Sequence, residues 1–315
     1  MPDTTRLDEV LSRCAAGALP ARMAAMHLLM EAQSPEAAQA ALARALKLSP
    51  APGAGRLREI ASLIAQHPQA WSTVRAILET AQHRPVPGDS VARWAGLFDA
   101  AVRISPEASV ALYSLGSPRL LTAATLEIVS MLSDWRVLGL DRTVLDIGCG
   151  IGRLVAALSP LSAAVIGLDI SPGMISQART RCAGFPNVSL RLGSGHDLAS
   201  IAVDSIDLVV LVDTFPYVLL SEGELADRYL AEIGRVLREG GDVAILNFSY
   251  RDDVAADCRE LERRAAPCGL SLVRVLERPC ASWDAPAYHL VKRACAAIGH
   301  RYAPGGLGWS AQLRS

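Results

Sequence analysis

The first 135 residues show the hydrophobic spacing of amphipathic helices. Apolar side chains recur three and four positions apart in successive stretches, which is the repeat of a helix that buries one face. These stretches cover 19–30, 57–64, 71–78 and 91–101. The pattern predicts an all-helical N-terminal domain over 1–85, with a linker at 84–88, and a helical lid or connector over 86–140.

The hydrophobic pattern changes at Thr143, where short apolar runs begin to alternate with segments of helical spacing. The runs cover 144–147, 164–168, 188–192, 207–212 and 242–248, and further strand-like runs follow at 270–276 and 288–292. Strands that alternate with helices require a parallel, doubly wound sheet. The sequence therefore predicts an α/β domain over 141–295, followed by a C-terminal tail over 296–315.

Helix starts are marked by capping residues. Ser34-Pro35, Ser117-Pro118 and Ser171-Pro172 each place an N-cap residue before a proline at the first helical position. Ser221 and Glu224 have the spacing of a capping box. They predict a helix that begins near Ser221 and ends at 240–241.

Composition and charge narrow the class of protein. The chain has 315 residues, 51% of them hydrophobic, and a formal net charge of −1 without a long basic run. A nucleic-acid partner is not expected, because it would need a basic surface. A secretory signal and an apolar run of membrane-spanning length are also missing. We therefore expect a cytoplasmic protein with no membrane partner.

The seven cysteines indicate neither disulfides nor a metal site. They are odd in number, widely scattered, and form no Cys-x-x-Cys pair or Cys/His cluster at zinc spacing. Reduced thiols and no bound metal are the expectation.

The segment 146–152 has the features of a cofactor-binding loop. A strand, a glycine-rich turn and a helix start bring backbone N–H groups close to a ligand. A dinucleotide site usually reads G-x-G-x-x-G, whereas Gly148, Gly150 and Gly152 follow G-x-G-x-G and Arg153 takes the third-glycine place. This spacing favours S-adenosylmethionine over a dinucleotide.

Two carboxylates accompany the loop. Asp146 lies two residues before the first glycine, where it would repel a pyrophosphate but suit the ammonium of an amino-acid group. Asp169 follows at the end of the second strand and can accept hydrogen bonds from both ribose hydroxyls. It suits either cofactor.

Five segments resemble the motifs of class I S-adenosylmethionine-dependent methyltransferases. They are 144–154 (VLDIGCGIGRL), 167–171 with Met174, 193–198, 206–209 and 230–241. The resemblance covers about 140–295. It implies a Rossmann-like, seven-stranded methyltransferase sheet whose last strand is antiparallel, and S-adenosylmethionine as the methyl donor.

The resemblance also implies the residues that bind the donor. They are Asp146, Gly148, Cys149, Gly150, Gly152, Asp169, Ile170, Met174, Ser194, Gly195, His196 and Asp213. Ser194 departs from the family, which commonly has an acidic residue there to receive the adenine amino group. Serine can still accept a hydrogen bond, and Asp197 lies close by.

The acceptor site is expected beyond the carboxyl ends of the strands. Methyl transfer needs a nucleophile held roughly 3–3.5 Å from the methyl carbon, and a base only if the acceptor loses a proton. Asp213, Tyr217 and His289 are the candidate catalytic residues, with a purely structural histidine as the alternative for His289. The candidate pocket walls are Tyr113, Phe215, Tyr217, Trp283 and Tyr288.

The predicted function is methyl transfer to a small-molecule acceptor, on oxygen or nitrogen, in specialised metabolism. Three alternatives stay open: a protein methyltransferase, a non-catalytic S-adenosylmethionine-binding scaffold, and an NAD-dependent oxidoreductase. The N-terminal helices are expected to act as a lid, as a homodimer contact, or as a module that binds a partner protein.

Overall fold

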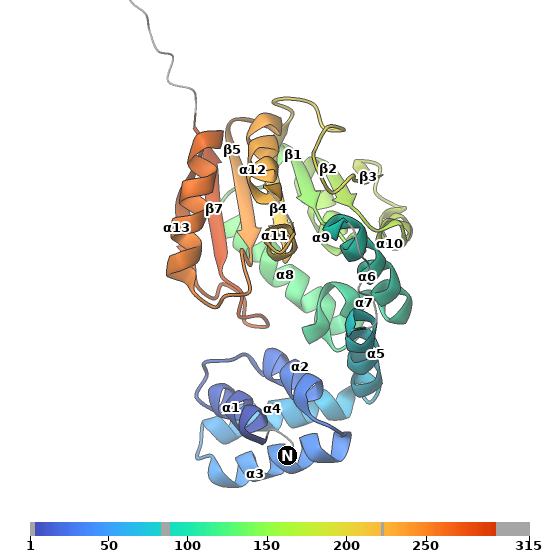
Figure 1. The fold of residues 1–315 in the computed structure, drawn as a ribbon, viewed down its shortest axis with the longest axis vertical. Helices are drawn as coiled ribbons and strands as arrows, with labels where there is room; N and C mark the ends of the chain where they lie inside the picture. The colour runs from blue at the N-terminus through green and yellow to red at the C-terminus, as the bar shows by residue number, and fades with distance from the viewer. Residues whose placement is uncertain (1–3, 83–88, 222–223, 294–315) are drawn as a thin grey trace, which may run out of the picture.

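The computed structural model describes residues 4–82, 89–221 and 224–293. A group of N-terminal helices lies at one end of the molecule and a sheet domain at the other, with further helices between them (Figure 1). The N-terminal helices are α1 (Thr4–Ala15), α2 (Ala21–Glu31), α3 (Pro35–Leu48), α4 (Gly53–Gln66) and α5 (Ala70–Gln82). This confirms the predicted helical N-terminal region. The predicted linker at 84–88 and the predicted tail at 296–315 both lie outside the described residues.

The connecting helices lead from this region to the sheet. They are α6 (Ser90–Ile104), α7 (Pro106–Val110), a 3₁₀ turn at Leu112–Ser114, and α8 (Pro118–Asp134). The predicted serine caps form, since Ser34 accepts a hydrogen bond from the N–H of Ala37 and Ser117 from that of Leu120. Each cap satisfies an N–H that the first helical turn leaves free.

The sheet has seven strands in the order β3-β2-β1-β4-β5-β7-β6. The strands are β1 (Gly139–Ile147), β2 (Ser162–Asp169), β3 (Val188–Leu192), β4 (Ile206–Val212), β5 (Leu237–Leu246), β6 (Leu270–Leu276) and β7 (Ala287–Lys292). Strands β1 to β5 are parallel, while β7 runs antiparallel to β5 and β6. This confirms the expected Rossmann-like methyltransferase sheet.

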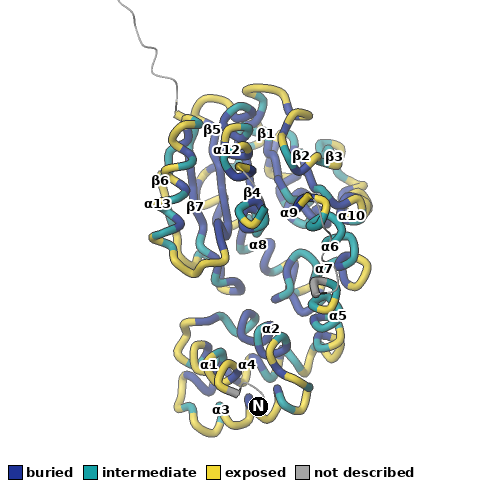
Figure 2. The backbone as a smooth tube through the Cα atoms, in the orientation of Figure 1, coloured by how far each residue is buried: buried dark blue, intermediate teal, exposed yellow. Residues whose placement is uncertain are grey.

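Helices cover both faces of the sheet and bury its central strands β4 and β5, while the edge strands β3 and β6 are less buried (Figure 2). The helices are α9 (Arg153–Leu158), α10 (Pro172–Cys182), α11 (Phe215–Leu219), α12 (Leu225–Val236) and α13 (Val254–Ala265). Val209 packs into the core of α12 and α13, and Val210 into that of the opposite face. Since neighbouring strand residues point to opposite faces, β4 is apolar from Leu208 to Val212, as its sequence predicted.

Two details differ from the predictions. Helix α12 begins at Leu225 without a side-chain cap, so the capping box does not form. Ser221 instead accepts a hydrogen bond from Trp94 Nε1 at 3.2 Å and donates one to the carbonyl of Tyr217. The helix ends at Val236 because β5 already begins at the next residue, beside Ile206 of β4.

No helix in the described part of the chain is long and apolar enough to cross a membrane.

Candidate functional site

The glycine loop joins β1 to α9 and has little space for side chains. All three glycines have left-handed φ angles, 75° at Gly148, 53° at Gly150 and 72° at Gly152, a region that disfavours other residues. A Cβ at Gly150 would lie 2.6 Å from Val110 Cγ1, and one at Gly148 only 2.2 Å from a side-chain atom of Thr214. Glycine is therefore required by both backbone angle and close packing.

Asp169 ties the end of β2 to this loop. Its Oδ2 accepts a hydrogen bond from the N–H of Gly150 at 2.8 Å, and its Oδ1 one from the N–H of Ser171 at 2.9 Å. Burial raises the pKa of Asp169, while these backbone donors oppose the rise. The carboxylate lies in the wall of a large cavity, where it can accept hydrogen bonds from the hydroxyl groups of a ligand.

Asp146 and Arg153 form a pair of opposite charges beside the loop. Burial raises the pKa of Asp146 to about 7, and the Arg153 guanidinium counteracts that rise. Arg153 is half-buried, lines the same cavity, and donates to Thr125 Oγ1 at 3.2 Å. A carboxylate and a guanidinium suit the ammonium and carboxylate of an amino-acid group. The sequence had identified Arg153 only as a residue in place of a glycine.

The other predicted donor-binding residues divide into two groups. Cys149, Ile170, Met174, Gly195 and Asp213 line the cavity with Asp146, Gly148, Gly150 and Asp169. Gly152, Ser194 and His196 are not part of its wall. Gly152 packs against Ala178 of α10.

The segment after β3 places an acidic residue in the cavity wall close to Ser194. Asp197 lines the cavity, and its Oδ1 accepts a hydrogen bond from Ser194 Oγ at 3.1 Å. Ser194 therefore positions the carboxylate that faces the site. His196 points elsewhere, with Nε2 lying 2.9 Å from Asp89 Oδ2.

Burial also determines the protonation state of the Cys149 thiol. It raises the pKa of the Cys149 thiol well above its usual value. The thiol therefore stays protonated and serves as a small filler, because only the thiolate is an effective nucleophile.

Helix α6 is fastened to the sheet domain by polar contacts along its length. They are Asp89 with His196, Trp94 with Ser221, and Asp99 with Ser171 and Gly173. Asp99 Oδ1 accepts hydrogen bonds from the Ser171 hydroxyl and, at 2.9 Å, from the N–H of Gly173. The helix thus covers the loop that follows Asp169.

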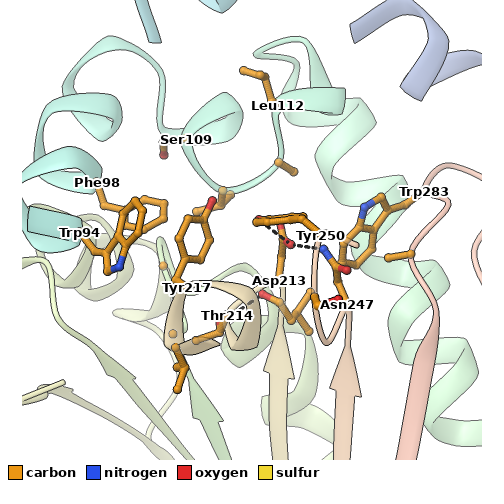
Figure 3. Close-up of a pocket in the computed structure, with 18 of the residues that line it drawn as sticks. Trp94, Phe98, Ser109, Leu112, Asp213, Thr214, Tyr217, Asn247, Tyr250 and Trp283 are labelled. Atoms are coloured by element: carbon orange, nitrogen blue, oxygen red, sulfur yellow. Dashed lines mark hydrogen bonds between the residues drawn. The ribbon is translucent and has the colours of Figure 1, made fainter. Parts of the chain in front are cut away.

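A second group of polar residues lies at the carboxyl ends of β4 and β5 (Figure 3). Asp213 Oδ1 accepts hydrogen bonds from Asn247 Nδ2 at 2.7 Å and from the Tyr250 hydroxyl at 3.1 Å. Burial raises the pKa of Asp213 to about 6, and both donors oppose that rise. The sequence gives no sign of the positions of Asn247 and Tyr250, because no motif marks them.

Aromatic rings surround Tyr217 next to this group. Its ring centroid lies 5.1 Å from Trp94, 5.2 Å from Phe98 and 5.9 Å from Tyr250, each time in an edge-to-face arrangement. Burial, followed by the charge of Asp213, raises the pKa of Tyr217 to about 12. The phenol is therefore protonated near neutral pH and acts as a wall of the cavity rather than as a base.

Tyr113 and Trp283 are two of the residues that the sequence analysis proposed as pocket walls. Their rings stack 5.8 Å apart, and both residues line the cavity.

Three predicted acceptor residues are not brought to the cavity. Phe215 is fully buried and stacks on Phe248, and Tyr288 is fully buried and donates to Asp257. His289 lies opposite Ala244 in the sheet, two pairs from the carboxyl end of β5. None of the three is among the residues that line the cavity.

The surroundings of His289 indicate a structural role and not that of a catalytic base. Its Nε2 lies 2.7 Å from Asp242 Oδ1, and its ring stacks on Trp135 at 4.9 Å. Since the last strand is antiparallel, its residue 289 falls in the middle of the sheet instead of at the reactive edge.

The cavity that unites these groups has a volume of about 960 Å³. The sheet domain supplies the glycine loop and the carboxyl ends of the strands, while α6, α7 and the turn at Leu112–Ser114 lie across from them. Met23, Met26 and Met30 of α2 add an apolar wall from the N-terminal helices. Within the described ranges, no group of three or more His, Cys, Asp or Glu residues could hold a metal ion.

Comparisons with known proteins agree with this geometry. Residues 145–245 match the family model described as a methyltransferase domain. A demethylmenaquinone methyltransferase of Tropheryma whipplei is 36% identical over 107 residues, covering 34% of this chain and 42% of that protein. One from Clavibacter sepedonicus is 31% identical over 142 residues, covering 44% of this chain and 51% of that protein. The matched segments thus span about half or less of these relatives.

A solved structure shares the fold. Phosphoethanolamine N-methyltransferase 1 of Haemonchus contortus, in complex with phosphoethanolamine and S-adenosylhomocysteine, superposes with a TM-score of 0.54 at 17% identity. The likeness covers 66% of this chain and 50% of that one. The sheet order, the glycine loop with its carboxylates and the family match lead to one assignment. Residues 145–245 are therefore a methyltransferase domain of the class I S-adenosylmethionine-dependent type.

Proposed function

We propose that the protein transfers the methyl group of S-adenosylmethionine to a small-molecule acceptor bound in the cavity. The observation that carries this proposal is that one cavity of about 960 Å³ joins the glycine loop to Asp213 and the aromatic residues. This is the upper part of the usual range for small-molecule sites. Helices lie across from the loop, so the space suits a donor and a compact acceptor better than a protein segment or a nucleic acid.

The donor end is the group around the glycine loop. Asp146 would hold the ammonium of the methionine portion and Arg153 its carboxylate. Asp169 would accept the ribose hydroxyls, and Asp197 the adenine amino group. When bound, S-adenosylmethionine supplies an activated methyl group. The protein's part is to orient it towards the ends of β4 and β5.

The acceptor end is the group around Asp213. A carboxylate with a pKa of about 6 is largely ionised at neutral pH, yet it is a better proton acceptor than an ordinary aspartate. It can remove a proton from a hydroxyl or an ammonium group. Asn247 and Tyr250 fix its orientation through hydrogen bonds to Oδ1.

The helices that cover the cavity would exclude water. α2 contributes methionines and α6 contributes Trp94 and Phe98 to its wall. Excluding water strengthens electrostatic interactions inside a site and favours transfer to the bound acceptor. We therefore assign these helices the role of a lid.

Calorimetry with S-adenosylmethionine, S-adenosylhomocysteine and NAD(H) tests the donor end. We expect micromolar binding of the two adenosyl ligands, lost in Asp169→Ala and retained in Asp134→Ala, a change at an exposed position of α8. Tight NAD(H) binding without adenosyl-ligand binding would overturn the proposal.

Transfer of a radiolabelled methyl group in a cell extract tests the acceptor class. We expect label in the small-molecule fraction that depends on Asp213. Label confined to protein would instead support a protein methyltransferase. Adenosyl-ligand binding with no transfer to either fraction would support a scaffold.

A further inference from the structure

We propose that the acceptor is a small amine, held as its ammonium form between aromatic rings and Asp213 and methylated on that nitrogen. The rings are those of Trp94, Phe98, Tyr217 and Tyr250, which we call the aromatic corner. This inference rests on the proposed function and specifies its substrate class.

The geometry of the aromatic corner suits a cation. The ring of Tyr217 stands at 68° to Trp94, at 80° to Phe98 and at 83° to Tyr250. All four residues line the cavity, so the acceptor end has several aromatic rings in different orientations in its wall (Figure 3). Aromatic faces carry partial negative charge and attract ammonium groups within about 6 Å of the ring centre.

A carboxylate lies beside the aromatic corner. The Tyr250 hydroxyl donates to Asp213 Oδ1, and Asn247 donates to the same oxygen. Among the described residues no hydrogen bond reaches Oδ2, which keeps its lone pairs for the acceptor. A carboxylate next to aromatic rings is the arrangement expected for an ammonium group.

The net charge of the residues that line the cavity also favours a cationic acceptor. Nine carboxylates and three guanidinium groups line it. Three of the carboxylates and Arg153 lie at the donor end. The other charged side chains are Asp213, Asp252, Asp253, Asp257, Glu277 and Asp284 against Arg13 and Arg278.

Three other groups near the acceptor end do not reverse this balance. Arg93 stacks on Trp94, with its guanidinium carbon 4.7 Å from the ring centroid, but it is not among the residues that line the cavity. It therefore covers one face of this ring only. Arg251 pairs with Asp257 and Glu260, so it neutralises part of the acidic charge but not that of Asp213. Burial lowers the pKa of His27, which keeps this residue neutral near pH 7. An anionic acceptor, such as a phosphate or a carboxylate, would meet repulsion here.

The reaction follows from these positions. Asp213 takes one proton from the ammonium, which frees the lone pair of the nitrogen. The nitrogen forms a bond to the methyl carbon while the carbon–sulfur bond of the donor breaks, and its electron pair remains on sulfur. The positive charge thus moves from sulfur to the methylated nitrogen, where the aromatic corner stabilises it. Asp213 later releases its proton to water.

Choline and its neutral isostere 3,3-dimethyl-1-butanol provide the test. Both have the same shape, but only choline carries the positive charge, and it mimics a methylated product. Calorimetry in the presence of saturating S-adenosylhomocysteine should show choline binding at least about tenfold more tightly than the alcohol. Equal or tighter binding of the alcohol would overturn the inference.

Variants test whether the aromatic corner causes the preference for choline over the neutral alcohol. Tyr217→Leu and, separately, Phe98→Leu keep apolar bulk but remove a ring, and each should reduce the preference for choline about three- to tenfold. Trp71→Leu, which removes a ring of α5 outside the cavity, should leave it unchanged. Retained affinity for S-adenosylhomocysteine reports that each variant is folded. A preference unchanged in both corner variants would contradict the assignment.

The two proposals fail in different ways. If the wild-type protein does not bind S-adenosylhomocysteine, the proposed function is contradicted. Binding of the adenosyl ligand together with methylation of alcohols, and none of matched primary amines, would contradict only the amine inference. Mass spectrometry of the products gives the methylated atom.

Discussion

Asn247 Nδ2 donates a hydrogen bond to Asp213 Oδ1 over 2.7 Å and so joins the carboxyl ends of β5 and β4. Both residues have left-handed φ angles, 63° for Asn247 and 56° for Asp213. Residues in this region are uncommon outside glycine and recur at functional sites. The contact fixes the carboxylate that we assign as the proton acceptor.

Replacing Asp213 by asparagine should lower kcat by about 10²–10⁴-fold, which is the usual contribution of a general base. The pKa of Asp213 is raised from 3.8 to about 6. The ionised form is the active one, so wild-type activity should fall as the pH decreases through about 6. A profile of kcat/KM against pH checks this. An unchanged low-pH limb in Asp213→Asn would contradict the assignment, whereas affinity for S-adenosylhomocysteine should stay within about twofold.

Asn247 should act on the reaction through Asp213. Its hydrogen bond lowers the pKa of Asp213, because it stabilises the ionised carboxylate. Asn247→Ala should therefore move the low-pH limb of activity to higher pH, and Tyr250→Phe should do the same. A general loss of activity with an unmoved limb would show that Asn247 has a structural role only.

The sequence predicted the sheet and the glycine loop because these depend on local pattern. Apolar runs such as 208–212 mark strands, and Gly148 to Gly152 mark a turn that must adopt left-handed angles. The site around Asp213 could not be predicted to the same extent. Asn247 and Tyr250 reach it only because β5 lies beside β4, and Trp94 reaches it only because α6 folds back over the sheet domain.

His289 is a residue for which the sequence suggested a catalytic role that its position in the sheet does not support. A histidine near a predicted strand end resembles a catalytic base in sequence. The antiparallel register places it opposite Ala244, where it contacts Asp242 and Trp135. Strand register is set by tertiary pairing, so the short segment around residue 289 could not reveal it.

Arg153 should recognise the carboxylate of the donor. Arg153→Met should weaken binding of S-adenosylmethionine about tenfold or more, since an ion pair in a cavity loses one partner. Decarboxylated S-adenosylmethionine has no such group, so its affinity should change little. Calorimetry with both ligands makes the comparison. Equal losses for the two would contradict the role.

Asp146 should make the stability of the ligand-free protein depend on pH. Burial raises its pKa in the folded protein from 3.8 to about 7, so the fold disfavours the ionised carboxylate. The free energy of unfolding should fall as the pH rises from about 4 to 7 and then level off. Asp146→Asn removes this effect and should be roughly 1–4 kcal/mol more stable than wild type at pH 8.

Urea unfolding at pH 4 and pH 8 measures the contribution of Asp146. The two proteins should converge in stability at pH 4, where the wild-type carboxyl is protonated in the folded protein. A constant difference at both pH values would show that packing, and not ionisation, separates them.

Asp99 should hold the lid closed. Its carboxylate accepts hydrogen bonds from the Ser171 hydroxyl and the Gly173 N–H at the start of α10, and hydrogen bonds to a charged group contribute about 1.5–3 kcal/mol. Asp99→Ala should release α6, speed amide hydrogen exchange along 90–104 and weaken S-adenosylhomocysteine binding about tenfold. Asp134→Ala serves as the control for removal of a helical carboxylate. Faster exchange with unchanged affinity would mean that α6 closes over the site without contributing to donor binding.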